Sequence, residues 1–239
     1  MVSPNAIRNV VGIIGNVMAI ILFLSPAPTF YKIWKKRSTE KFKADPYLAT
    51  VLNCTLWVFY GLPLVHPNNL LVVTSNCAGF ALEAIFLIIY FTFANKKQRR
   101  RVALALLIEV AFVAAVISLV LSLAHTHKLR TRIVGIICMI INCAMYASPL
   151  TIMRIVMKTK SVKYMPFYLS LAGFLTSVCW AAYALIEFDL FIVIPNGAGV
   201  VLGIIQLILY GWFYRSTNWD DDEAQIPEVQ PPKPLAQTT

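Results

Sequence analysis

The sequence predicts an all-α membrane protein with seven transmembrane helices, arranged as two parallel three-helix bundles joined by a linker helix. Three observations support this fold class. Hydrophobic residues make up 59% of the 239 residues and the mean hydropathy is +0.70. Only 13% of the residues are charged, against about one quarter in an average soluble domain. The apolar residues form seven long runs, and motifs of the first three runs recur in the last three.

The seven predicted spans are apolar runs of about 20 residues that end at charged residues or at Pro and Asn breaks. Arg8 alone precedes the first run, which continues into Ser25-Pro26 and a basic loop without a small-residue cleavage site. We therefore interpret this run as a retained helix and not as a signal peptide. The predicted spans are Val10–Phe30, Pro46–Val65, Leu70–Ala94, Val102–Ala124, Ile133–Met157, Met165–Ile186 and Leu190–Tyr214.

Basic residues predict the orientation of these spans. The loops after the first, third and fifth spans hold 15 of the 21 Lys and Arg residues. Positive charge accumulates in cytosolic loops of membrane proteins, so the N-terminus is expected outside and the C-terminus in the cytosol. After Tyr214 an acidic run at 220–223 is followed by several prolines, which predicts a disordered cytosolic tail over 216–239.

An internal repeat organises the spans. One span lies between two similar triplets, so both triplets begin on the same side of the membrane and the repeats are parallel. Parallel repeats are an architecture of secondary transporters. The recurring residues are Ser25-Pro26 as Ser148-Pro149, and Trp57 and Tyr60 as Trp180 and Tyr183, all at an offset of 123, and 76–79 as 196–199 at an offset of 120.

This repeat predicts the organisation of the whole chain. A first three-helix repeat occupies residues 1–98, a linker helix residues 99–128, a second three-helix repeat residues 129–215, and the tail residues 216–239. Two equivalent half-bundles can enclose a path between them.

Paired polar and aromatic residues mark candidate sites on this path. Asn76 and Asn196 each lie about six residues inside their spans, or roughly 9 Å deep. A single buried asparagine is more often an interhelical hydrogen-bonding residue, but an equivalent pair in two parallel repeats indicates a shared axis. Trp57 and Trp180 are also related by the repeat. A lone tryptophan is usually core or lipid-facing, whereas this pair is compatible with two walls of one site.

Four prolines lie near the predicted cytosolic ends of the first, second, fifth and sixth spans: Pro26, Pro46, Pro149 and Pro166. A proline inside a helix removes one backbone hydrogen bond and kinks or loosens the helix, whereas a proline at a helix end is harmless. Four at one depth, two in each repeat, favour hinges over harmless end residues.

The chain also carries a recognisable family signature. The motifs are SPAPTFYKIWKKRSTEKF at 25–42, TSNCAG at 74–79, ASPLTIMRIVMKTKSVKYMPFYLSL at 147–171 and IPNGAG at 194–199. They resemble the MtN3/saliva repeats of the plant SWEET sugar transporters, and the resemblance covers residues 7–215. It implies a bidirectional facilitative uniporter, in the plasma membrane and homo-oligomeric, that carries a monosaccharide such as glucose by alternating access.

The resemblance also implies roles for individual residues. Asn76, Asn196, Trp57 and Trp180 would bind the sugar. Tyr60 and Asp189 would form the outer gate, and the four prolines would flank the inner gate. Four further positions relate to substrate size in the family. Leu22, Asn53 and Met145 follow the monosaccharide pattern of bulkier or amide side chains, and Thr176 departs from it.

Two other transport or signalling classes fit part of the sequence. A proton-linked exporter of a small solute could use similar three-helix repeats, with Glu83 as the coupling residue, although a structural role for Glu83 and Glu109 is favoured because the second repeat has no equivalent acid. A seven-helix receptor fits the span number and orientation, but it has no need of two equivalent halves.

Composition argues against the remaining classes. The sequence shows no nucleophile placed with a general base, so nothing in it indicates an enzyme. The positive charge gathers in loops between spans, which argues against a nucleic-acid partner. All five cysteines lie in apolar spans without metal-ligand spacing, so we expect no metal and no cofactor. The expected partners are the monosaccharide and the lipid bilayer.

Overall fold

The structure is a computed structural model that describes residues 3–219. The part of the predicted tail from residue 220 onward lies outside the described residues. The described chain is helical, with nine helices that are joined by short loops: α1 (Pro4–Phe23), α2 (Ala27–Lys36), α3 (Asp45–Gly61), α4 (Leu70–Phe93), α5 (Lys96–Leu123), α6 (His127–Met145), α7 (Ala147–Thr159), α8 (Phe167–Ile186) and α9 (Leu190–Phe213).

These nine helices form seven spans, because α1 with α2 and α6 with α7 are each one span broken near its end. Six of the seven described segments have the length and apolar composition needed to cross a membrane. The remaining one, α3, has 17 residues and reaches about 26 Å at 1.5 Å per residue, close to the hydrocarbon thickness of a bilayer. The predicted all-α fold with seven membrane helices is confirmed.

The first span of each repeat was predicted as one helix, and the structure breaks both. Proline lacks a backbone N–H and its ring clashes with the carbonyl four residues earlier, which is the carbonyl of Leu22 for Pro26 and of Met145 for Pro149. The breaks follow at Leu24–Pro26 and at Tyr146. Equivalent residues therefore interrupt both first spans.

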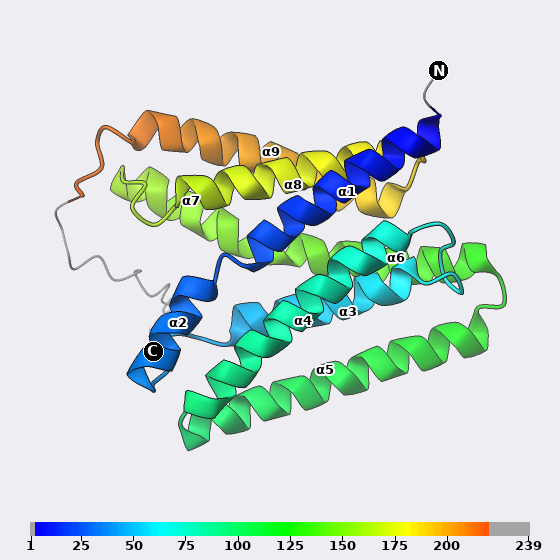
Figure 1. The fold of residues 1–239 in the computed structure, drawn as a ribbon, viewed down its shortest axis with the longest axis horizontal. Helices are drawn as coiled ribbons and strands as arrows, with labels where there is room; N and C mark the ends of the chain where they lie inside the picture. Colours follow the sequence, from blue (N-terminus) through cyan, green and yellow to red (C-terminus); the bar gives the residue numbers. More distant parts are fainter. Residues whose placement is uncertain (1–2, 220–239) are drawn as a thin grey trace, which may run out of the picture.

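Each repeat packs its third span between the other two. In the first repeat α4 lies between α1 and α3, and in the second α9 lies between α6 and α8. The two units meet where α1 packs along α8 and α3 packs along α6. Figure 1 shows the linker α5 on the far side of the first repeat from α8 and α9. The space between the units is therefore bordered by both repeats and not by α5.

The backbone itself records the duplication. Arg37 ends α2 and Lys160 ends α7, and both residues are left-handed, with φ of 53° and 55°. They are 123 residues apart, the offset found in the sequence. Side-chain caps fix other helix starts, including a reciprocal capping box between Asn95 and Gln98 at the start of α5.

Candidate functional site

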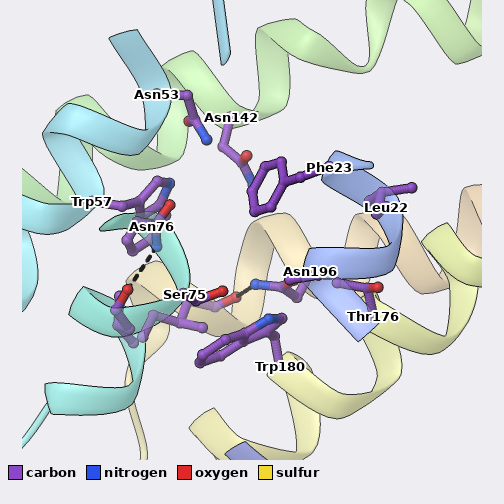
Figure 2. A pocket seen from close by; sticks show the side chains of 13 residues that line it. Leu22, Phe23, Asn53, Trp57, Ser75, Asn76, Asn142, Thr176, Trp180 and Asn196 are labelled. Atoms are coloured by element: carbon purple, nitrogen blue, oxygen red, sulfur yellow. Dashed lines mark hydrogen bonds between the residues drawn. The ribbon is translucent and has the colours of Figure 1, made fainter. Parts of the chain in front are cut away.

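A cavity of about 120 Å³ lies between the two repeats at mid-height. Figure 2 shows side chains from both repeats turned toward it. Seven of the eight residues predicted to contact the substrate and to set its size line this cavity, together with six residues to which the sequence assigned no role. The lining residues are Ala19, Leu22, Phe23, Asn53, Trp57, Val72, Ser75, Asn76, Asn142, Thr176, Trp180, Ile192 and Asn196.

The predicted asparagine pair faces this cavity with matched geometry. Asn76 Nδ2 donates to the Val72 carbonyl at 2.9 Å, and Asn196 Nδ2 donates to the Ile192 carbonyl at 2.8 Å. Each bond reaches back one helical turn and fixes the direction of the amide. An amide has two N–H donors and a carbonyl acceptor, so each asparagine retains one donor and its acceptor for a solute.

The two tryptophans form equivalent walls. Trp57 is 6% exposed and Trp180 is 9% exposed. Each indole packs edge-on against the tyrosine three residues later, Tyr60 or Tyr183, with ring centroids 5.3 Å apart in both repeats. The tyrosines therefore hold the indoles in place, and the indoles give the cavity apolar, aromatic surfaces.

The residues predicted to set substrate size occupy two levels. Leu22, Asn53 and Thr176 line the cavity described above, whereas Met145 lines only a larger cavity that continues from it. The carbonyl oxygen of Asn53 is buried without a hydrogen-bond partner among the described residues, so it is available to a solute.

Asn142, like Ser75, is a polar residue of this cavity to which the sequence assigned no role, and it offers an amide. The repeat could not reveal it, because the position 123 residues earlier holds Ala19. The one available signal was an amide at membrane depth, which requires a partner or a solute.

Aromatic residues at the ends of α1 and α6 leave no room for a side chain at two glycines of the repeat. A Cβ on Gly79 would lie 2.5 Å from the ring of Phe23, and a Cβ on Gly199 would lie 2.6 Å from the hydroxyl of Tyr146. Tyr146 also donates to the Pro195 carbonyl at 2.5 Å. Only glycine allows these rings to approach the third span of each repeat.

One end of the cavity is closed by hydrogen bonds between the repeats. Tyr60 donates its hydroxyl to Asp189 Oδ2 at 2.7 Å, which is the contact predicted for the outer gate. A second bond joins Tyr183 to Asn69 Oδ1 at 3.2 Å. Tyr60 corresponds to Tyr183 at an offset of 123 and Asn69 corresponds to Asp189 at an offset of 120, so the two bonds are reciprocal. All four side chains are buried.

Arg8 contacts both partners of the Tyr183–Asn69 bond, one in each repeat. It donates to Asn69 Oδ1 at 2.9 Å, pairs with Glu187 at 2.7 Å and lies over the ring of Tyr183 at 4.1 Å. The two terminal nitrogens of its guanidinium thus have partners although the residue is only 7% exposed, whereas its Nε has none among the described residues. Sequence reasoning missed this residue because it precedes the predicted first span.

His66 lies in the loop between α3 and α4, beside the Tyr60–Asp189 bond. Its ring stacks on Tyr60 with centroids 5.1 Å apart, and its Nε2 lies 3.7 Å from Asp189 Oδ2. Burial lowers the pKa of His66, because the charged imidazolium loses water there, and the carboxylate of Asp189 opposes this shift.

The other end of the cavity leads toward the predicted prolines. A second cavity of about 440 Å³ shares Leu22, Asn53 and Asn196 with the first one and is lined farther on by Pro26, Pro46 and Pro149. Pro46 lies in the first turn of α3 and Pro166 directly precedes α8, where a missing N–H breaks no helical bond. The helix breaks are at Pro26 and beside Pro149, and the hinge role of all four remains a prediction.

Two like-oriented three-helix units around a polar and aromatic cavity, shut at one end and continuous with a larger cavity at the other, define a membrane transport protein. The family follows from comparison with known proteins. The chain belongs to the MtN3_slv family, described as "Sugar efflux transporter for intercellular exchange", whose model matches residues 9–98 and 132–218. The resemblance to the SWEET family is confirmed, and the members of this family are sugar transporters and not enzymes.

Individual relatives agree with this assignment. The chain is 55% identical to the bidirectional sugar transporter SWEET7b of Oryza sativa subsp. indica, over 97% of this chain and 87% of the relative. It is 52% identical to the bidirectional sugar transporter SWEET5 of Arabidopsis thaliana, over 93% of each chain. The solved structure of a eukaryotic SWEET transporter superposes with a TM-score of 0.83 at 39% identity, over 87% of this chain and 97% of that one.

Proposed function

We propose that this sugar transporter is a facilitative uniporter that carries a hexose such as glucose in both directions by alternating access. The observation that supports it most is the pairing of amides and indoles around one cavity: Asn76 with Asn196, and Trp57 with Trp180. A pyranose has apolar C–H faces and a rim of hydroxyl groups. Indole rings suit the faces, and amides suit the hydroxyls because they both donate and accept.

The preference for a monosaccharide rests on the size of the site. Leu22 and the amide of Asn53 narrow the cavity of about 120 Å³, and Met145 narrows the continuation toward the prolines. A disaccharide would need these side chains to move apart. The sugar should bind weakly, because a millimolar dissociation constant corresponds to only about −4 kcal/mol and lets the substrate leave on either side.

Alternating access is supported by the unequal ends of the cavity. The bonds Tyr60–Asp189 and Tyr183–Asn69 hold one end shut, and the larger cavity extends toward the prolines at the other. Rocking of one repeat against the other would break these bonds and close the proline end. The helix breaks at Pro26 and Tyr146 are suitable places for such movement.

The same proposal includes the orientation of the carrier in the membrane, its repeat boundaries, its cellular membrane and its oligomeric state. The proline end bears most of the basic residues, so we assign it to the cytosol and the Tyr60 end to the outside, with the N-terminus outside. The repeats correspond to residues 1–98 and 129–215, with residues 99–128 as the linker. We assign the carrier to the plasma membrane as a homo-oligomer.

A competition experiment in liposomes tests the proposal. Radiolabelled glucose uptake by the purified protein is measured with excess unlabelled glucose, galactose, fructose or sucrose, and Asn196→Ala is the inactive control. We expect competition by hexoses, little competition by sucrose, and no uptake by the variant. Equal uptake by the variant would remove the asparagine pair from the mechanism, and sucrose uptake at the glucose rate would contradict the assignment to hexoses.

A further inference from the structure

The larger cavity contains one acidic residue that the transport mechanism above does not use. Glu83 lies on α4 in the wall of the cavity of about 440 Å³ and is 4% exposed. Its Oε2 atom is buried and has no hydrogen-bond partner among the described residues. A buried carboxyl oxygen without a partner costs free energy. A solute that donates a hydrogen bond to it would offset this cost.

The position of Glu83 relates it directly to the sugar site. Glu83 follows Asn76 by seven residues, which is two helical turns, so both side chains lie on the same face of α4. At 1.5 Å per residue, Glu83 lies about 10 Å farther toward the proline end. The two cavities share lining residues and form one path. A solute that leaves the amide pair toward the prolines therefore passes this carboxyl group.

The described wall of the larger cavity offers Glu83 no countercharge. Within the described residues, the wall of this cavity holds no Lys, Arg, His or Asp, and its other titratable side chains are Tyr47 and Tyr146. Among the described residues of this wall, Glu83 therefore has no ion-pair partner. The remaining polar wall groups are hydroxyls and amides, including Thr50 on the same repeat and Gln206 on the other.

The carboxyl group lies on one side of the path, because the second repeat has no acidic residue equivalent to Glu83. The position equivalent to Glu83 in the second repeat is Gly203, at an offset of 120, and a Cβ there would lie 2.8 Å from Phe174. The second repeat instead contributes the amide of Gln206. The main site thus has an amide on each side, whereas this part of the path has a carboxyl group on one side and an amide on the other.

We propose that Glu83 and Gln206 form a second, transient binding site for the hydroxyl groups of a neutral sugar or polyol on its way between the amide pair and the proline end. The proposal rests on the proposed function. A carboxyl group accepts hydrogen bonds from hydroxyls whether or not it is ionised, and the amide both donates and accepts. The site lowers the cost of moving a hydroxylated solute past the apolar wall residues Leu202 and Phe174.

Glucose exchange in liposomes tests this site with Glu83→Met and Glu83→Gln. Methionine keeps the volume and unbranched shape but removes the polar atoms, whereas glutamine keeps a hydrogen-bonding group. We expect Glu83→Met to slow equilibrium exchange of glucose by about 3- to 10-fold, the loss of roughly one hydrogen bond at the barrier, and Glu83→Gln to stay within about twofold of the original protein. Glucose affinity, measured by quenching of tryptophan fluorescence, should change less than about twofold in both.

Glu109→Gln is the matched control. Glu109 also has a buried oxygen without a partner among the described residues, but it lines a separate cavity between α3, α4 and α5 and not the path. Its exchange rate should equal that of the original protein. If Glu83→Met lowers the melting temperature, Gln206→Leu tests the opposite wall and should also slow exchange without weakening glucose binding.

The outcomes separate this proposal from the proposed function. If the original protein exchanges glucose and both Glu83→Met and Gln206→Leu exchange it at the same rate, the second site is overturned and the proposed uniporter function stands. Uphill glucose uptake driven by a pH gradient and lost in Glu83→Gln would also overturn it, because Glu83 would then bind a proton and not a sugar. No glucose exchange by the original protein would refute the proposed function itself.

Discussion

Replacing Tyr60 by phenylalanine removes one hydroxyl group from the closed end of the transporter and should shift it toward opening at that end. The hydroxyl donates to Asp189 at 2.7 Å and is fully buried, and it links α3 of the first repeat to the start of α9 in the second. Phenylalanine keeps the ring that packs on Trp57 and His66. The substitution therefore isolates the bond from the packing.

The expected size of the shift follows from the type of hydrogen bond. A hydrogen bond to a charged group contributes about 1.5–3 kcal/mol, so Tyr60→Phe should change the ratio of closed to open forms roughly 10- to 150-fold. The reciprocal bond of Tyr183 is longer, at 3.2 Å, and its acceptor Asn69 keeps a second donor in Arg8. Tyr183→Phe should therefore shift the same ratio only about 2- to 10-fold.

Pulsed electron spin resonance can measure this ratio. Spin labels at Leu70 and Phe188, which are 71% and 70% exposed, report the distance across the closed end, one label in each repeat. The exposed Cys77 is replaced by serine to prevent stray labelling. The longer distance should gain population in the order original protein, Tyr183→Phe, Tyr60→Phe.

Tyr168→Phe provides the control, because Tyr168 lies on α8 and is 84% exposed. Its distance distribution should match that of the original protein. An unchanged distribution in Tyr60→Phe, or a larger opening in Tyr183→Phe than in Tyr60→Phe, would refute the view that these two bonds hold the end shut.

Three further predictions follow from the structure. Gly79→Ala should lower both the melting temperature and glucose uptake, because its Cβ would lie 2.5 Å from Phe23, whereas Gly197→Ala, with nothing within 4 Å, should change neither. Burial lowers the pKa of His66, so the closed form binds a proton less readily than the unfolded chain; the melting temperature should fall as pH drops below 6.5, and His66→Gln, but not His125→Gln, should flatten this dependence. Asn53→Ser should widen the site and raise sucrose uptake relative to glucose uptake, measured with both labelled sugars; an unchanged ratio would contradict the size argument.

The sequence by itself determined the membrane class, the seven spans and the duplication. These features depend on apolar run length and on recurring motifs, which need no knowledge of packing. The offsets of 123 and 120 also identified Trp57 with Trp180 and Asn76 with Asn196 as equivalent pairs. Once the repeats were known to be parallel, a shared axis followed, and the structure turns all four side chains toward one cavity.

Only the tertiary structure decided which residues without a repeat partner reach the path. Asn142 lines the cavity between the paired amides and Glu83 the larger one, whereas Glu109, a buried carboxyl group of the same kind, lies outside both. The sequence places all three at membrane depth but does not fix the rotation of each helix about its axis. That rotation is set by contacts between residues far apart in the chain, such as Phe23 against Gly79.

At the closed end, too, the sequence determined one part of the arrangement and the tertiary structure the other. The equivalence of Tyr60 with Tyr183 and of Asn69 with Asp189 was already present in the sequence, but the crossed pairing of these residues required the two repeats to be brought face to face. Likewise, prolines that look alike in the sequence break a helix at Pro26 and start one at Pro46. The physical reason is that a proline's effect depends on whether a helix precedes it, which the packing of neighbouring spans decides.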